Sequence, residues 1–422
     1  MEHPVGSPDG ANVQAEILTA ENIGQFTEGL PQRGKMAIAA LLDMRYGELH
    51  AIMPNGKQMR VVGREPGPAA HVRMHNWNLV TKSLWGATIG VAESYIDGDW
   101  ESDDPTAFME LFTVNMETGD AVAGAPNTIF NMFERLRHWL RSNTRFGSKR
   151  NIAAHYDLGN AFYEKWLDPS MTYSSALFGK GANDLESAQM AKYRRLARAA
   201  GIEPSHEVLE IGCGWGGLSE FLAREIGCKV TALTISKEQF LYARARMARL
   251  GLDDRVTVKL QDYRDEKNLY DRIVSVEMFE AVGEKYWTTY FDKLRECLKA
   301  GGRAGLQAIS IAESSYEAYR RRPDFIQRYI FPGGMLPTVA IMEQLGRDAG
   351  LQLKDNFPFR LDYARTLAEW RQRFNAAWGA IAPLGFDERF RRMWEFYLHY
   401  CEAGFRAGNT DVHQLIYQKP AE

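Results

Sequence analysis

The ten residues 208–217 read VLEIGCGWGG, and this stretch decides the fold of the chain. The apolar run 208–211 is typical of a buried strand, and glycines at the alternate positions 212, 214 and 216 predict a tight turn. Residues 218–222 then take helical spacing. The stretch therefore predicts a strand, a glycine turn and a helix start, where a ligand can approach both the backbone and free N–H groups.

A glycine turn after a strand is weak evidence for any one ligand, because dinucleotide sites look similar and a plain structural turn is also open. Two details favour S-adenosylmethionine (SAM) over a dinucleotide. The spacing is GxGxG through Gly212, Gly214 and Gly216, not GxGxxG, and Trp215 lies inside it. Glu210 precedes the glycines, where its carboxylate can meet the ammonium of a methionine moiety.

Strand and helix patterns alternate on both sides of this turn, which predicts a doubly wound, Rossmann-like parallel sheet with helices on both faces. Two long helices form a helical insert before a last strand. Aromatic residues at helical spacing in the insert are expected to be core, with an acyl-chain tunnel as the alternative. The expected strands are 207–211, 229–235, 255–261, 271–278, 303–309 and 412–418, and the helices 217–226, 237–250, 284–299, 361–380 and 386–407.

Residues 15–128 are expected to form a separate small α+β domain associated with lipid, behind a disordered tail at 1–14. Residues 46–62 predict a hairpin around Asn55-Gly56, a strong two-residue turn signal. Residues 65–68, Glu-Pro-Gly-Pro, are expected to be loop. The SAM-binding domain is expected at 151–422.

Between the two domains, residues 129–150 predict a basic amphipathic helix. Arginines and lysines alternate there with aromatic and aliphatic residues, and only Glu134 is acidic. Such a pattern suits the headgroup layer of a membrane surface. A solvated helix that links the domains is the alternative.

Composition sets the limits for partners. The net charge of −3 over 422 residues gives no general attraction to nucleic acid, so we expect no nucleic-acid partner. The four cysteines show no metal or redox spacing, which suits a reducing cytoplasm, and no metal is expected. No apolar run approaches the ~20 residues of a membrane span, and the first twelve residues carry no secretory signal.

Polar side chains follow further strands of the predicted sheet, at the edge where such sheets bind ligands. Thr234 and Gln239 are candidates for the ribose. Asp262 is a candidate for the adenine amino group, with Tyr263 stacked on the ring. Residues 277–280 follow the fourth strand and are also candidate ligand residues.

The chain resembles the cyclopropane-fatty-acyl-phospholipid synthase family over its whole length. The motifs that carry the resemblance are His155–Asn160, Met171–Ser174, Thr234–Gln239, Gln261–Asp265, Met278–Glu280 and Tyr329–Gly334.

The resemblance implies methyl transfer from SAM to the double bond of unsaturated phospholipid acyl chains. It implies SAM binding by Tyr173, Ser174, the turn at 209–217, residues 234–239 and Tyr263. A peripheral enzyme on the inner face of the membrane, and a homodimer, are expected. A small-molecule N-methyltransferase and a non-catalytic lipid-binding protein are the alternatives.

The resemblance also implies a hydrogencarbonate ion held by Glu280, Tyr363 and the backbone of Ile309. Two ligand positions depart from the family pattern, because Ser175 stands for the usual cysteine and Gln307 for the usual histidine. The ring of Tyr363 can stabilise positive charge on the substrate. Proton loss from the new methyl group gives a cyclopropane, which the resemblance implies, and loss from a neighbouring carbon gives a methyl-branched alkene.

Overall fold

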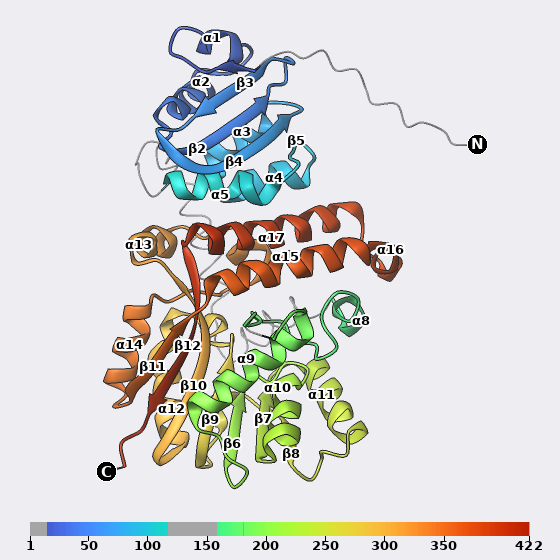
Figure 1. Ribbon diagram of the computed structural model, residues 1–422, viewed down its shortest axis with the longest axis vertical. Helices are drawn as coiled ribbons and strands as arrows, with labels where there is room; N and C mark the ends of the chain where they lie inside the picture. Colours follow the sequence, from blue (N-terminus) through green and yellow to red (C-terminus); the bar gives the residue numbers. More distant parts are fainter. Residues whose placement is uncertain (1–14, 117–157, 180, 422) are drawn as a thin grey trace, which may run out of the picture. The chain divides into compact units, whose positions relative to one another are not determined.

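The computed structural model describes residues 15–116, 158–179 and 181–421 (Figure 1). The chain divides into two compact units, residues 1–125 and 126–422. The predicted tail at 1–14, the predicted basic helix at 129–150 and the first half of the family motif His155–Asn160 lie outside the described residues. The domain boundaries at 128 and 151 therefore stay predictions.

The amino-terminal unit contains a five-stranded sheet in the order β1-β3-β2-β4-β5. The predicted hairpin is confirmed, because β2 and β3 pair antiparallel and Gly56 between them has φ 82°. Buried and partly exposed residues alternate along β2, as expected of a sheet with one covered face. The elements are β1 (Glu16–Ile17), α1 (Ile23–Phe26), α2 (Gln32–Ala39), β2 (Tyr46–Ile52), β3 (Gln58–Val62), β4 (Glu65–Met74), α3 (Asn78–Gly86), α4 (Thr88–Ile96), β5 (Trp100–Glu101) and α5 (Pro105–Met116).

The expected loop at 65–68 is wrong, because these residues begin strand β4. β4 runs parallel to β2, and the register shifts between the pairs Tyr46–Glu65 and Glu48–Ala69. Pro66 and Pro68 lie within that shift. A proline cannot donate a ladder hydrogen bond, so strands tolerate it at such irregular positions.

The second unit is built on a seven-stranded sheet in the order β11-β12-β10-β9-β6-β7-β8. Five strands run parallel, and β12 pairs antiparallel with both β10 and β11. Predicted strand 207–211 matches β6, whereas β11 was missed. The strands are β6 (Glu207–Ile211), β7 (Lys229–Thr234), β8 (Val256–Leu260), β9 (Tyr270–Val276), β10 (Leu298–Ile311), β11 (Gln352–Pro358) and β12 (Thr410–Gln418).

Helices cover both faces of this sheet, so the predicted doubly wound fold is confirmed (Figure 1). One apolar core gathers residues of α9 (Leu185–Ala200), α10 (Gly217–Phe221) and α11 (Lys237–Arg249). The other gathers residues of α12 (Trp287–Cys297) and α14 (Val339–Asp348). Strand order reverses beside β6, so the glycine turn lies at the point where such sheets bind ligands.

The predicted helical insert consists mainly of α15 (Arg360–Ala376) and α17 (Glu388–Ala407), which follow β11 and precede β12 in the chain and lie side by side (Figure 1). Most of its aromatic residues are core, as expected. Trp370, Phe374, Trp394 and Phe396 are almost fully buried. The described part of this unit also contains the shorter helices α8 (Asn160–Tyr163), α13 (Glu313–Arg321) and α16 (Trp378–Ile381).

Candidate active site

The glycine turn after β6 has the backbone that its sequence predicts. Gly212, Gly214 and Gly216 all have positive φ, at 85°, 52° and 87°. A Cβ added to Gly214 would meet no atom within 4 Å, whereas at Gly212 it would lie 2.8 Å from Cγ of Met278. Gly214 therefore borders open space while Gly212 is packed, and such a turn fits the close approach of SAM to the backbone.

Glu210 lies on β6, directly before this turn, and is almost fully buried. The hydroxyl of Ser219 donates a hydrogen bond to its carboxylate. Burial raises the pKa of Glu210 to about 7, and the Ser219 hydrogen bond opposes that rise. A buried carboxylate of this kind is stabilised by a cation, so the structure fits the predicted ammonium partner, which stays a prediction.

The residues predicted to hold the nucleoside lie at neighbouring strand ends. Thr234, the last residue of β7, donates to Gln239 at 3.0 Å, and the Ser236 hydroxyl caps α11. Asp262 forms a two-point ion pair with Arg264 at 2.9 and 2.6 Å. That ion pair takes part of the acceptor capacity that we assigned to the adenine amino group. Tyr263 is partly buried and packs against the core that contains residues of α12 and α14.

The predicted ligands Tyr173 and Ser174 face other elements of the same unit. The hydroxyls of Tyr173 and Tyr397 form a hydrogen bond of 2.8 Å. The fully buried ammonium group of Lys192 donates to the Ser174 hydroxyl at 2.7 Å. Burial lowers the pKa of Lys192 to about 7, while Glu277 and Asp168 attract its charge. Trp215 donates its indole N–H to Asn160 at 2.7 Å.

The structure brings three of the predicted catalytic residues together around Glu277. The backbone N–H of Ser175 donates to Oε1 of Glu277 at 2.9 Å, and Nε2 of Gln307 donates to the same oxygen at 2.8 Å. The Tyr363 hydroxyl donates to Oε2 at 2.6 Å. Burial raises the pKa of Glu277, while the charge of Lys192 and these hydrogen bonds lower it.

Sequence reasoning placed Glu277 among residues 277–280 as a candidate ligand but missed this role. Glu277 directly follows β9 and has φ 49°, a left-handed conformation that costs a residue with a side chain about 1–2 kcal/mol. Strain of this kind often accompanies a functional constraint. The departures from the family pattern at Ser175 and Gln307 could have indicated this role, because both residues donate hydrogen bonds to the carboxylate of Glu277.

Glu280 lies next to Glu277 and is held differently. The backbone N–H of Ile309 donates to Oε1 of Glu280 at 2.5 Å. Among the described residues, its buried Oε2 has no hydrogen-bond partner. Burial and the charge of Glu277 raise the pKa of Glu280 to about 8. The two buried carboxyl groups raise each other's cost of ionisation, so they lose their protons as a coupled pair.

This arrangement does not fit a hydrogencarbonate ion. The backbone N–H of Ser175, the Gln307 amide and the Tyr363 hydroxyl all donate to the carboxylate of Glu277. The Ser175 hydroxyl donates to the carbonyl of Ala176, and the N–H of Ile309 donates to Glu280. A second anion beside Glu277 would also be repelled by its charge. A side-chain carboxylate takes the place that the resemblance gives to a bound ion.

Aromatic side chains pack around the ring of Tyr173. Its ring centroid lies 5.1 Å from that of Trp370, 5.6 Å from that of Trp166 and 6.5 Å from that of Phe331. Tyr363 lies 6.2 Å from Trp370. These faces can stabilise a sulfonium or a cationic carbon in surroundings with little water.

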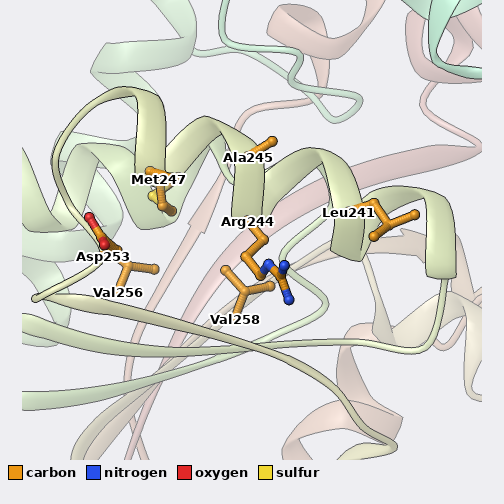
Figure 2. A pocket seen from close by; sticks show the side chains of 8 residues that line it. Leu241, Arg244, Ala245, Met247, Asp253, Val256 and Val258 are labelled. Carbon is orange, nitrogen blue, oxygen red and sulfur yellow. The ribbon is translucent and has the colours of Figure 1, made fainter.

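A separate pocket of about 500 Å³ lies between α11 and β8. Figure 2 shows the side chains that line it. It contributes no residue to the site described above. Its lining residues are Leu241, Arg244, Ala245, Met247, Ala248, Asp253, Val256 and Val258.

The fold and the glycine turn define a SAM-dependent methyltransferase. Residues 144–415 match the family model described as mycolic acid cyclopropane synthetase, and the chain belongs to this family. It is 40% identical over 353 residues to a tuberculostearic acid methyltransferase of Mycobacterium tuberculosis, covering 79% of each chain. It is 36% identical over 360 residues to a cyclopropane-fatty-acyl-phospholipid synthase of Escherichia coli, covering 84% of this chain and 89% of that one.

Solved structures agree with this assignment. A mycolic acid cyclopropane synthase, CmaA1, crystallised with SAH and CTAB, is 29% identical, with a TM-score of 0.60 over 64% of this chain and 98% of that one. A coclaurine N-methyltransferase with 20% identity and a TM-score of 0.57 shows the fold alone.

Proposed function

We propose that this enzyme methylates the double bond of unsaturated acyl chains in membrane phospholipids and that Glu277 accepts the proton released. The convergence of Ser175, Gln307 and Tyr363 on Glu277 carries the proposal. The names of the two relatives above refer to fatty acids, and this supports unsaturated acyl chains as the substrate class.

SAM supplies an electrophilic methyl group: a carbon–carbon bond forms to the alkene, the sulfur–methyl bond breaks, and the alkene's other carbon becomes cationic. Because an alkene is a poor nucleophile, the residues of the glycine turn and Tyr173 must hold donor and acceptor in close alignment. The aromatic rings of Tyr173, Trp370 and Tyr363 stabilise the positive charge and exclude water.

A base must then remove one proton from the substrate. Three hydrogen-bond donors and the charge of Lys192 favour the ionised form of Glu277, and in that form it can take up the proton and become a neutral acid. Glu280, protonated at neutral pH, keeps its unpaired Oε2 in the same buried region. Neutral Gln307 cannot carry the proton away as a histidine can, and its part is to orient Glu277.

Two products share these steps. Loss of a proton from the transferred methyl closes a cyclopropane, and loss from a neighbouring chain carbon leaves a methyl-branched alkene. The 40% identity to a tuberculostearic acid methyltransferase favours the methyl-branched alkene. Mild hydrogenation followed by mass spectrometry distinguishes them, because the alkene gains two hydrogens and the ring gains none.

The place of action is part of the proposal. Among the described residues, no helix is long and apolar enough to span a bilayer. The basic and aromatic pattern at 129–150 supports peripheral binding to anionic lipid on the cytoplasmic face. The homodimer stays a prediction, to be tested by light scattering of the purified enzyme.

Incubation with methyl-labelled SAM and vesicles of unsaturated phospholipid tests the function. We expect label in the acyl chains. Label in an added small amine and none in lipid would favour the N-methyltransferase alternative. Vesicle binding without any label would favour the lipid-binding alternative.

A further inference from the structure

A chain of hydrogen bonds runs from Glu277 to the surface of the second unit. Gln307 donates to Glu277 at 2.8 Å, and Gln414 donates through Nε2 to Oε1 of Gln307 at 3.0 Å. Arg195 donates through Nη1 to Oε1 of Gln414 at 2.9 Å. Gln307 and Gln414 are almost completely buried, whereas the Arg195 side chain is 22% exposed.

The chain has one direction, and Arg195 sets it. A guanidinium can only donate, so the Gln414 oxygen must face Arg195 and its NH₂ group must face inward. The Gln307 oxygen then accepts from Gln414, and the Gln307 NH₂ group faces Glu277. Carbonyl acceptors agree with both orientations, because Gln414 also donates to the Lys192 carbonyl at 3.2 Å and Gln307 to the Ser175 carbonyl at 3.3 Å.

Arg195 is itself held in place by two contacts from the edge strand β11. Its Nη2 donates to Asp355 at 2.7 Å. Its guanidinium carbon lies 3.9 Å from the ring centroid of Phe357. An ion pair on one side and an aromatic face on the other leave Nη1 directed at Gln414.

We propose that Arg195 is a positioning residue that, through Gln414 and Gln307, directs an amide donor at the carboxylate of Glu277. This inference rests on the proposed role of Glu277 as the proton acceptor. Without a donor-only group at the outer end, the longer hydrogen bonds to the Lys192 and Ser175 carbonyls, at 3.2 and 3.3 Å, still favour the present orientation of the amides. They hold it less strongly, and an amide that turns over presents an oxygen to the carboxylate. Two oxygens would then face each other, which favours the protonated form of Glu277.

Other charged and titratable groups also face Glu277 and remain the same in the test. They are Lys192 of α9, Tyr363 of α15 and Glu280 of the following turn. Gln414 contacts Lys192 only at its backbone carbonyl, so a change at Arg195 or Gln414 keeps all three ionisable side chains, and a shift in the titration of Glu277 reports on the hydrogen-bond chain.

The experiment is an infrared titration of the full-length enzyme, in which the C=O stretch of a protonated carboxyl is followed against pH. Subtraction of a Glu277→Gln spectrum assigns the band of Glu277. We expect Arg195→Gln to raise the midpoint by on the order of one pH unit, since a donor to the charged form is lost. Arg195→Lys, which keeps a donor-only group, should remain near the wild-type midpoint.

Gln414→Met separates the hydrogen-bond chain from the charge of Arg195, because it breaks the chain and keeps the charge. We expect it to raise the midpoint as Arg195→Gln does. The exposed neighbour Arg194→Gln is the matched control and should cause no shift.

If the titration midpoint of Glu277 shifted in Arg195→Gln but not in Gln414→Met, Arg195 would act through its charge alone, and the proposal would be overturned. A wild-type midpoint in both variants would overturn it as well. The titration needs no turnover. If Glu277→Gln kept full activity, the proposed function would fail while this measurement still decided the role of Arg195.

Discussion

The hydroxyl of Tyr363 donates a 2.6 Å hydrogen bond to the carboxylate of Glu277, 86 positions earlier in the chain. Tyr363 lies on α15 of the helical insert, and Glu277 follows β9 of the sheet. The contact joins the insert to the edge of the sheet where the glycine turn lies. It also fixes the carboxylate that takes the place of an external anion.

Glu277→Gln should lower the turnover number by roughly 10²–10⁴-fold, the usual range for loss of a general base. Affinity for SAM should stay close to wild type, because none of the predicted SAM ligands is changed. Steady-state kinetics and calorimetry of SAM binding together check this. Turnover within a few-fold of wild type would exclude Glu277 as the proton acceptor.

The methyl-transfer rate should fall as pH decreases through the pKa of Glu277, because only the ionised carboxylate accepts a proton. Burial raises that pKa above the ordinary glutamate value, so the acid limb should lie above pH 4.5. A pH–rate profile under saturating SAM measures it. A rate that stays constant down to pH 4.5 would contradict the assignment.

Glu280 should make the fold less stable as pH rises. Its pKa is about 8 in the folded state, against 4.5 as the model value for an exposed glutamate. A carboxyl group whose pKa is higher in the folded than in the unfolded state stabilises the fold fully at pH values below its unfolded-state pKa. This contribution is lost as pH rises from that value towards the folded-state pKa of about 8.

Urea unfolding at several pH values tests this contribution. Wild type should lose more free energy of unfolding between pH 5 and 9 than Glu280→Gln does, because the amide does not titrate. Glu203→Gln, at a side chain that is 69% exposed, is the control. Equal pH dependence in Glu280→Gln and wild type would show that Glu280 titrates normally.

Gly214→Val should abolish SAM binding in a folded protein, because its side chain would enter the open space beside the turn. Gly251→Val is a matched control: Gly251 also has positive φ, at 65°, and open space around its Cβ position. The control bears similar backbone strain and should bind SAM normally. Calorimetry that finds unchanged affinity in Gly214→Val would exclude this site.

Reversal of Arg137, Arg141 and Arg145 to glutamate should weaken binding to anionic vesicles, by ~1 kcal/mol for each basic residue near the surface. Salt should weaken wild-type binding in the same way. Co-sedimentation measures both effects. The control reverses the exposed Arg194, Arg244 and Arg249, and an equal loss in both variants would mean that only net charge matters.

Local patterns in the sequence were sufficient to predict the doubly wound sheet. Periodicity and glycine positions depend on neighbouring residues, so strand β6, the turn and the helices beside it were predictable. Strand β11 was missed because its pairing with β12 joins segments separated by the helical insert. The strand at Glu65–Met74 was missed at its start because two prolines there are typical of a loop.

The candidate site was only partly predictable for the same reason. Ser175, Gln307 and Tyr363 were named from the family resemblance, and the structure places all three on one carboxylate. This carboxylate belongs to Glu277, which directly follows β9 and has a left-handed backbone. A conformation of that kind leaves no pattern in the sequence around it.

In the proposed function, the carboxylate of Glu277 takes the role that the family resemblance gives to hydrogencarbonate. Glu277→Gly removes the carboxylate, suits the positive φ of 49° and leaves three donors facing the vacated space. The decisive measurement is the methyl-transfer rate of wild type and this variant in carbon-dioxide-free buffer, with and without added hydrogencarbonate. We predict that wild type is indifferent to the ion, whereas the variant is inactive without it and regains activity as it is added. A wild-type enzyme that loses activity when hydrogencarbonate is removed would contradict the account.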